Sequence, residues 1–265
     1  FGLLCLQESC RMIVANLATY PPRRENLENV VATISPQVDR LNIVLNQYDA
    51  VPPELGRYPN VFACIPDEDL KDVGKFQPDV RDAEYVFLID DDIVYPPDYV
   101  AGSIQHLEAL GLGNCMGGYH GSLYVKPSLR QLLRSPELLL TYKNRVADFR
   151  SYGFGFFNAL NEATVVDQIG TGTAILRGKD MPTFEYMRTS QRFVDVRLAR
   201  WCFERGITPV CLPRVAHWLG ALSNEESIYG SFTTSHPAHV NAEILYYAFK
   251  VKFRGRRVSG IYLSD

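Results

Sequence analysis

The sequence predicts an α/β fold with a mostly parallel central sheet flanked by helices. Residues 85–89, Tyr-Val-Phe-Leu-Ile, are all aromatic or aliphatic, which is typical of a central strand buried on both faces. Three carboxylates, Asp90, Asp91 and Asp92, follow this run directly. Ligands bind beyond the carboxyl ends of strands in open α/β sheets. The acidic residues are therefore predicted to lie at a binding edge.

The segments before the acidic strand alternate in the order strand, helix, strand, strand. Residues 23–35 carry apolar side chains at helical spacing, and Pro36 ends the pattern. Short apolar runs at 12–17, 41–45 and 61–65 predict the three strands. This order suits a nucleotide-binding half of an α/β protein.

The segments after the acidic strand are less uniform. Residues 99–110 fit an amphipathic helix that ends at Gly111. Residues 126–163 mix basic, polar and aromatic side chains, which suits either an active-site flap that faces an acceptor or a packing cluster. The remaining predicted elements are a glycine-interrupted strand at 114–124, a strand at 165–177 with a turn at 170–172, a helix at 196–205, a strand at 206–214 and a helix at 240–249.

The composition is that of a soluble globular protein with one large domain. The chain has 265 residues, of which 46% are hydrophobic and 22% charged. A net charge of -3 gives no electrostatic reason to expect a nucleic-acid partner. No run is long enough to span a membrane, and six scattered cysteines favour free thiols in a reducing cytoplasm. The chain starts without methionine, which is compatible with a fragment fused to further domains.

The acidic run suggests a metal site. Side chains alternate along a strand, so Asp90 and Asp92 are expected to point the same way and Asp91 the opposite way. Two converging carboxylates are usually neutralised by a hard divalent cation. The alternative is a solvated acidic turn. An EF-hand calcium site is excluded because Tyr95 and Ala101 occupy its glycine and glutamate positions. The sequence also contains neither a Walker phosphate-binding loop nor the Gly-x-Gly-x-x-Gly fingerprint of dinucleotide-binding proteins.

A hydrophobic strand that closes on Asp90-Asp91-Asp92 and continues Ile-Val-Tyr-Pro-Pro-Asp-Tyr resembles the signature of GT-A fold, nucleotide-sugar glycosyltransferases. The segment is similar to family-2 members that build bacterial polysaccharides and capsules. The resemblance implies a single Rossmann-like GT-A domain over residues 1–265. Residues 11–100 would bind the nucleotide sugar and residues 101–265 the acceptor. It also implies Mn²⁺ or Mg²⁺ held by Asp90 and Asp92, and a UDP-sugar donor.

The same resemblance carries over several donor-binding residues. Thr19, in the loop after the first strand, is expected to touch the uridine, and one of Asn46, Tyr48 and Asp49 is expected to contact the base. Asp72 would hydrogen-bond the base and Lys75 would lie against phosphate, in the segment Asp-Leu-Lys-Asp-Val-Gly-Lys-Phe. Ordinary loop and turn chemistry is the alternative for these residues. The full set of expected donor-binding residues is Thr19, Asn46, Tyr48, Asp72, Lys75, Asp90 and Asp91.

On the acceptor side, Asp195 resembles the catalytic base of inverting members, which takes the proton of the attacking hydroxyl. Its alternative role is that of a helix N-cap. His217 follows in the order expected for a further metal ligand, and neutral imidazole is acceptable to manganese. His120 is a weaker candidate, because a lone histidine is more often structural.

The predicted function is metal-dependent transfer of a sugar from a UDP-sugar to a hydroxyl of a saccharide or polysaccharide acceptor. A sugar-nucleotidyltransferase is one alternative, although the loop after the first strand lacks its usual glycine-rich sequence. A non-catalytic carbohydrate-binding or scaffolding module is another. The basic tail at 250–257 is either a solvated terminus or a contact with anionic lipid. The expected location is cytoplasmic, with peripheral association at the inner face of the membrane as a variant.

Overall fold

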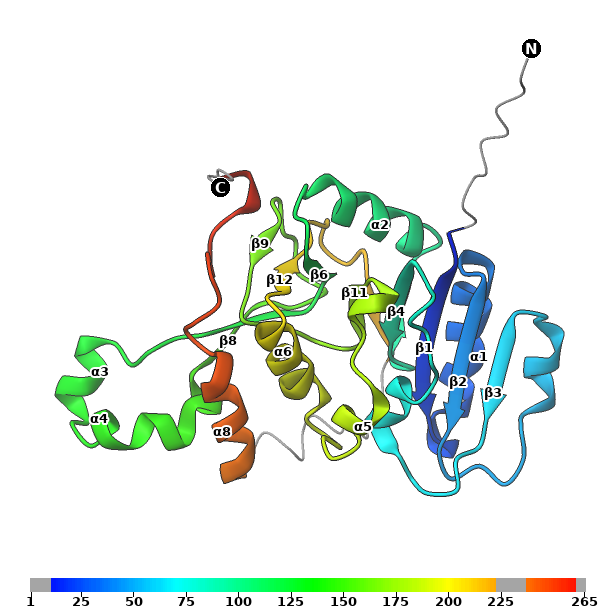
Figure 1. Ribbon diagram of the computed structural model, residues 1–265, viewed down its shortest axis with the longest axis horizontal. Helices are drawn as coiled ribbons and strands as arrows, with labels where there is room; N and C mark the ends of the chain where they lie inside the picture. The colour runs from blue at the N-terminus through cyan, green and yellow to red at the C-terminus, as the bar shows by residue number, and fades with distance from the viewer. Residues whose placement is uncertain (1–10, 223–236, 261–265) are drawn as a thin grey trace, which may run out of the picture.

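The computed structural model describes residues 11–222 and 237–260. Its central sheet has eight strands in the order β3-β2-β1-β4-β11-β6-β12-β9 (Figure 1). Four neighbouring pairs are parallel, whereas β11 runs antiparallel to both its neighbours and β9 to β12. The predicted α/β class with a mostly parallel sheet is therefore confirmed. The strands are β1 (Ile13–Thr19), β2 (Arg40–Leu45), β3 (Val61–Cys64), β4 (Tyr85–Ile89), β6 (Cys115–Gly118), β9 (Thr164–Val165), β11 (Thr173–Leu176) and β12 (Thr208–Cys211).

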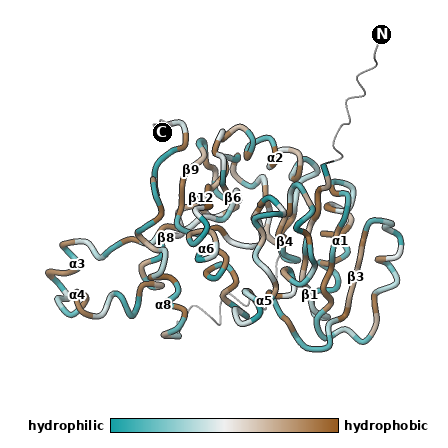
Figure 2. Tube along the Cα trace, viewed as in Figure 1, coloured by the Kyte–Doolittle hydropathy of each residue, from teal (hydrophilic) through white to brown (hydrophobic). Residues whose placement is uncertain are grey.

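Strand β4 is apolar throughout because both faces of the sheet are covered. Tyr85, Phe87 and Ile89 pack into one core with helices α1 (Arg24–Ile34) and α2 (Tyr99–Ala109). The alternate residues, Val86 and Leu88, pack into a second core. That core is covered by the 3-10 helix η4 (Lys71–Phe76), α5 (Phe184–Met187) and α6 (Val194–Glu204). Figure 2 shows the hydrophobic strands between these layers.

Two predicted strands are each divided in the structure. The glycine-interrupted segment forms β6 and then β7 (Gly121–Tyr124), which leaves the main sheet and pairs with β8 (Arg150–Phe154) and β10 (Gln168–Ile169). The strand predicted at 165–177 likewise becomes β9, β10 and β11. Glycine permits these changes of direction. A Cβ on Gly118 would lie 2.9 Å from the Thr173 carbonyl oxygen, so only glycine lets β6 approach β11 this closely.

The segment with no clear pattern, residues 126–163, is largely helical in its first half. It contains α3 (Leu129–Arg134), α4 (Leu138–Thr141) and the 3-10 helix η5 (Tyr142–Phe149). Helix α8 (Ala238–Tyr247) packs against η5 and α6. A two-stranded sheet joins β5 (Ile93–Val94) to β13 (Gly220–Ala221) beside the acidic turn.

The described residues include four of the six cysteines and most of the chain in which a membrane-spanning helix could lie. Cys64, Cys115, Cys202 and Cys211 are free, and all but Cys64 are buried. The other two, Cys5 and Cys10, lie outside the described residues. Within 11–222 and 237–260, no helix combines the length and hydropathy that a membrane crossing requires.

Candidate functional site

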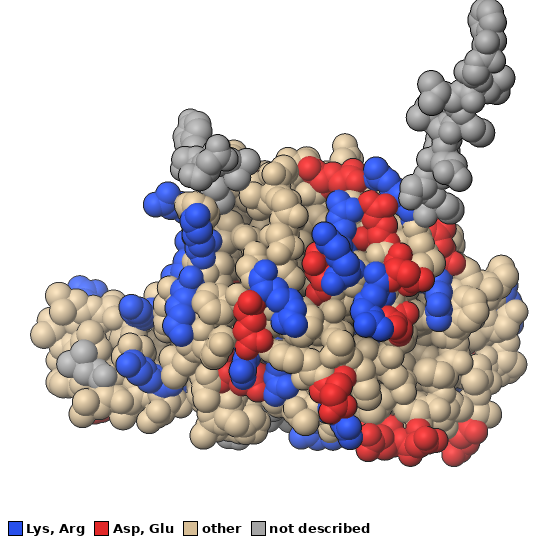
Figure 3. Space-filling view, viewed as in Figure 1, with Lys and Arg blue, Asp and Glu red and all other residues tan. Residues whose placement is uncertain are grey.

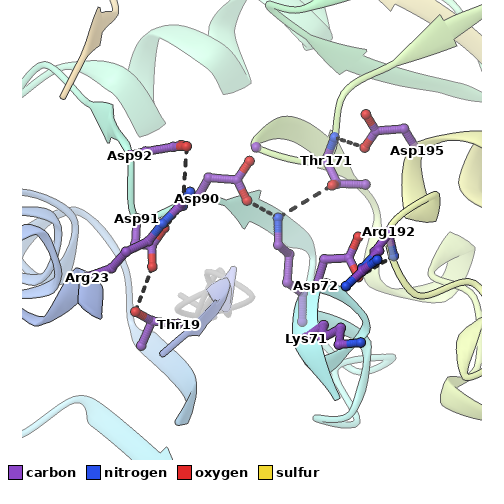
Figure 4. A network of polar contacts seen from close by, with 12 residues as sticks. Thr19, Arg23, Lys71, Asp72, Asp90, Asp91, Asp92, Thr171, Arg192 and Asp195 are labelled. Atoms are coloured by element: carbon purple, nitrogen blue, oxygen red, sulfur yellow. Dashed lines mark hydrogen bonds and ion pairs between the residues drawn. The ribbon is translucent and has the colours of Figure 1, made fainter. Parts of the chain in front are cut away.

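The acidic residues form a turn rather than a continuation of β4, which ends at Ile89. The expected alternation of the three side chains therefore does not hold. Arg23 Nη1 donates to Asp91 Oδ1 and, over 3.2 Å, to Asp92 Oδ2, so Asp91 and Asp92 converge on one guanidinium (Figure 4). Asp91 also accepts a 2.6 Å hydrogen bond from Thr19 Oγ1, which fixes the acidic turn to the end of β1.

Asp90 has a different cationic partner. The Lys75 ammonium forms an ion pair with Asp90 and lies 3.4 Å from Thr171 Oγ1. The Lys75 side chain is only 2% exposed. Burial disfavours its charged form, but the charges of Asp90, Asp195 and Asp72 outweigh burial, so the pKa of Lys75 is raised. Lys75 is therefore a buried cation at the carboxyl end of β4.

Asp195 reaches the same cluster through the loop before β11. Its Oδ1 accepts a 2.8 Å hydrogen bond from the backbone N–H of Thr171. Among the described residues, Asp195 Oδ2 accepts no hydrogen bond, so this oxygen is available to another donor. The alternative N-cap role is wrong, because α6 begins at Val194 with Phe193 as its cap and Asp195 lies in the first turn.

A pocket of about 240 Å³ opens beside this cluster, at the ends of β1, β2 and β4. Its lining contains four basic and four acidic side chains, a mixture that can bind both phosphate and polar donor groups. The charged lining residues are Arg23, Lys71, Lys75, Arg192, Asp69, Asp72, Asp90 and Asp91.

Six of the seven expected donor-binding residues line this pocket, and the seventh lies outside its lining. The six are Thr19, Asn46, Asp72, Lys75, Asp90 and Asp91. Tyr48 instead packs beside the first core, and its hydroxyl donates to the Tyr20 carbonyl over 3.4 Å. Asn46 uses both ends of its amide to hold the neighbouring loop, through Leu70 N–H and the Lys71 carbonyl. Its contact with a base stays a prediction.

The carboxyl groups differ in how their charge is compensated. Burial raises the pKa of Asp92 to about 6, and the charge of Asp90 adds to the effect. Burial also raises the pKa of Asp72 to about 6, although Asp72 accepts a 2.8 Å hydrogen bond from the Arg192 N–H. The pKa of Asp91 is raised by burial too, against the opposing effect of Arg23. Burial is thus the main cause of the raised pKa of all three carboxyl groups.

Carboxylate oxygens of this kind suit Mg²⁺ or Mn²⁺. These ions are commonly held by one or two carboxylates, with water and substrate phosphates completing the shell. Over the described residues, no three His, Cys, Asp or Glu side chains form a group that could hold a metal ion. Binding of a divalent ion by Asp90 and Asp92, whose carboxylates pair with Lys75 and Arg23 in this structure, stays a prediction. His217 is exposed in the loop before β13 and does not complete a three-ligand set among the described residues. The chain just after β13 does reach the acidic turn, because the Leu222 N–H donates to the Asp92 carbonyl oxygen over 2.9 Å.

His120 lies between β6 and β7 and is half-buried. Burial, together with the nearby positive charges of Arg150 and Arg214, lowers its pKa to about 4. Its ring lies 5.8 Å from that of Phe156. His120 is therefore neutral at physiological pH, and its role stays a prediction.

Some site residues were not expected from the sequence. Arg23 is buried against the acidic turn. The sequence feature that could have pointed to it is its position directly after the Pro-Pro pair that follows β1. Arg192 has a left-handed backbone, with φ of 70°, and donates its N–H to Asp72. Thr171 joins Lys75 to Asp195 from a distant part of the chain. No local sequence pattern predicts the long-range contacts of Arg192 and Thr171.

Gly172 is required by the position of Asp90. A Cβ there would lie 2.8 Å from Asp90 Cγ and closer still to Oδ2. Gly172→Ala is expected to displace the carboxylate from Lys75 and to lower the free energy of unfolding by about 1–3 kcal/mol. Gly170→Ala is the control, because its Cβ would meet His120 at an ordinary 3.4 Å. Urea unfolding of both variants checks this, and equal stabilities would contradict it.

No protein-family model matches the sequence, and no curated protein matches it significantly. Solved structures do resemble it. Glucosyl-3-phosphoglycerate synthase from Mycobacterium tuberculosis, in complex with Mn²⁺, UDP-glucose and phosphoglyceric acid, is 14% identical with a TM-score of 0.40, over 74% of this chain and 66% of that chain. The same enzyme with Mg²⁺ and UDP is 13% identical with a TM-score of 0.49, over 90% of this chain and 80% of that chain.

A further similar structure is described only as a mycobacterial protein, at 15% identity and a TM-score of 0.41, over 76% of this chain and 65% of that chain. The chain thus spans slightly less than two thirds of two of these three structures. The synthase structures contain the ligand types expected from the motif resemblance, namely UDP or UDP-glucose with Mn²⁺ or Mg²⁺. At these low identities and TM-scores, the function proposed below rests on the side chains of this protein.

Proposed function

We propose that the protein is a divalent-metal-dependent glycosyltransferase that moves a sugar from a nucleoside-diphosphate sugar to a hydroxyl of a saccharide acceptor. One observation carries the proposal. A single pocket at the ends of β1, β2 and β4 combines the buried cations Arg23 and Lys75 with Asp72, Asp90 and Asp91. Cations suit a diphosphate, and carboxylates suit a metal ion and the N–H groups of a base. UDP is the proposed carrier, as the motif resemblance implies.

The pocket residues divide into three proposed roles. Thr19 and Asn46, at the ends of β1 and β2, lie where uridine would be held, and Asp72 accepts a hydrogen bond from the base. Lys75 and Arg23 lie against the diphosphate. Asp90 and Asp92 would hold a divalent ion, which would supply positive charge to the departing nucleoside diphosphate. His217 is not needed for this two-carboxylate site.

Asp195 is the proposed base. Thr171 N–H holds Asp195 Oδ1, which orients the carboxylate and leaves Oδ2 to take the proton of the acceptor hydroxyl. The oxygen of that hydroxyl then bonds to the anomeric carbon while the bond to the diphosphate oxygen breaks. A single displacement of this kind inverts the anomeric configuration. Lys75 lines the donor pocket and lies 3.4 Å from Oγ1 of Thr171, the residue that holds Asp195, and therefore links the two sides of the proposed reaction.

The division of labour within the chain is also part of the proposal. Residues 11–100 supply most of the donor pocket, and residues 101–265 supply Asp195 and the acceptor side. The proposed setting is polysaccharide synthesis in the cytoplasm or at the inner face of the membrane.

Release of free nucleoside diphosphate from a panel of nucleotide sugars, with and without Mn²⁺, tests the proposal. We expect metal-dependent release with one donor class in the presence of a saccharide acceptor, and its loss in Asp92→Asn. Cleavage that instead releases pyrophosphate from a nucleoside triphosphate would indicate a sugar-nucleotidyltransferase. Tight donor binding without release, over a broad acceptor panel, would indicate a binding module.

The raised pKa of Asp72 makes a pH prediction for donor binding. Below about pH 6 the carboxyl is protonated and loses its capacity as a charged acceptor, so uridine should bind about tenfold more weakly at pH 5 than at pH 7. Uridine is used instead of UDP because it has no phosphate that titrates in this range. Calorimetry on wild type and Asp72→Asn checks the prediction. Equal pH dependence in the two proteins would contradict it.

A further inference from the structure

Residues 125–148, called the arm below, extend from the body of the protein at the end opposite the donor-binding strands (Figure 1). The arm contains α3, α4 and most of η5. No residue of α3 is buried. Leu129, Leu133 and Leu140 are 73%, 76% and 84% exposed, and Val125 is 55% exposed. Large apolar side chains at this level of exposure, gathered in one segment, indicate a surface that binds something.

The arm is also basic, in contrast to the rest of the chain. It carries five Lys or Arg and two Asp or Glu, which gives a net charge of +3. Because the whole chain has a net charge of -3, the remaining residues carry -6. All five basic side chains are exposed, and Figure 3 shows how lysine and arginine side chains are distributed over one face of the protein. They are Lys126, Arg130, Arg134, Lys143 and Arg145.

The geometry of α3 places the two kinds of side chain next to each other. Leu129 and Leu133 are four residues apart and share one helix face, and Arg130 and Arg134 share the adjacent face. A capping box formed by Ser128 and Gln131 fixes the start of the helix. The helix therefore presents an apolar stripe with a basic edge, and Figure 2 shows hydrophobic stretches in this part of the chain.

We propose that the arm docks on an anionic membrane surface. Leucines enter the boundary between headgroups and acyl chains, while the lysines and arginines contact lipid phosphates. An acidic soluble polymer would pair with the basic groups but leave the leucines in water. A symmetric contact between the arms of two copies would cover the leucines but bring two segments of charge +3 together. An anionic bilayer satisfies both features at once.

The base of the arm adjoins a second basic segment. Lys126 Nζ lies 5.6 Å from the centre of the Phe249 ring, directly before Lys250 and Lys252. Lys250 and Lys252 are both exposed. The arm and the start of the basic tail therefore meet at Lys126 and Phe249, and their exposed basic side chains could face the same membrane.

Co-sedimentation of the full chain with vesicles tests this inference. We expect binding to phosphatidylcholine vesicles that contain phosphatidylglycerol, weaker binding at high salt, and little binding to phosphatidylcholine alone. Leu129→Ser/Leu133→Ser and Arg130→Glu/Arg134→Glu should each lower the partition coefficient about tenfold or more. Both pairs are exposed, so urea unfolding should be unchanged in these variants.

Val215→Ser and Lys179→Glu are the matched controls, because both residues are exposed and lie outside the arm. Vesicle binding should be unchanged in these controls. Absence of wild-type binding to either vesicle, or equal binding of arm and control variants, would overturn the inference. A change in oligomeric state in the arm variants, measured by light scattering without any effect on vesicles, would instead assign the surface to a second copy of this chain. The readout is sedimentation, so the result does not depend on the proposed sugar transfer.

Discussion

Replacing Asp195 by asparagine is expected to lower the turnover of sugar transfer about 10²–10⁴-fold and to leave donor affinity within about threefold. Asparagine retains an Oδ1 that accepts the Thr171 N–H, so the loop before β11 keeps its position. It cannot take a proton from the acceptor hydroxyl. The measurement is steady-state release of nucleoside diphosphate in the presence of acceptor, with donor affinity determined separately.

Asp195→Ala is the informative comparison, because it removes the proton acceptor and the contact with Thr171 together. If the role of Asp195 is to orient the loop, asparagine should retain most of the activity and only alanine should lose it. If Asp195 is the base, both variants should be inactive to a similar degree. High activity in Asp195→Asn would therefore contradict the proposed mechanism.

Arg23→Met is expected to lower the free energy of unfolding by about 3–5 kcal/mol. Arg23 is buried, and its guanidinium compensates Asp91, which is also buried, and Asp92. Methionine fills much of the same volume but leaves these carboxylates without that cation. Arg24→Met is a matched control at the next position. Its partner is Glu54, and the Arg24 side chain is 55% exposed, so a loss below about 1 kcal/mol is expected.

Urea unfolding of the two variants checks this prediction, and similar losses at both positions would contradict it. A second variant separates charge from packing. Adding Asp91→Asn to Arg23→Met removes one of the unpaired charges and keeps a side-chain oxygen for Thr19. Partial recovery of stability would assign the loss to charge, and no recovery would assign it to packing.

Local patterns predicted the parts of the fold that depend on near neighbours in the sequence. The bounds of β4 follow from five apolar residues that end at Asp90, and α1 and α2 follow from helical spacing between proline and glycine signals. The split of residues 165–177 into β9, β10 and β11 depends instead on pairing with four different strands, β12, β7, β4 and β6. No pattern within that segment encodes such pairing.

The same distinction applies to the site. The end of the buried strand predicted that Asp90 lies at a binding edge, and the resemblance to GT-A glycosyltransferases predicted Thr19 and Asn46, all of which line the pocket. The contacts of Arg23 with Asp91 and of Arg192 with Asp72 join residues 68 and 120 positions apart, and only the folded chain brings them together. The predicted alternation of the Asp90, Asp91 and Asp92 side chains was wrong, because these residues form a turn and side chains alternate only along a strand.

The position of β11 between β4 and β6 has a consequence for how the chain can be made. Residues 11–100 contain β1 to β4 and most of the donor pocket, yet β4 finds one of its two partners only at Thr173–Leu176. Until the ribosome has released that segment, one edge of an entirely apolar strand has no hydrogen-bonding partner. Such edges promote aggregation. Residues 11–100, expressed alone, should therefore accumulate as insoluble protein, and a chain that extends past β12 should not.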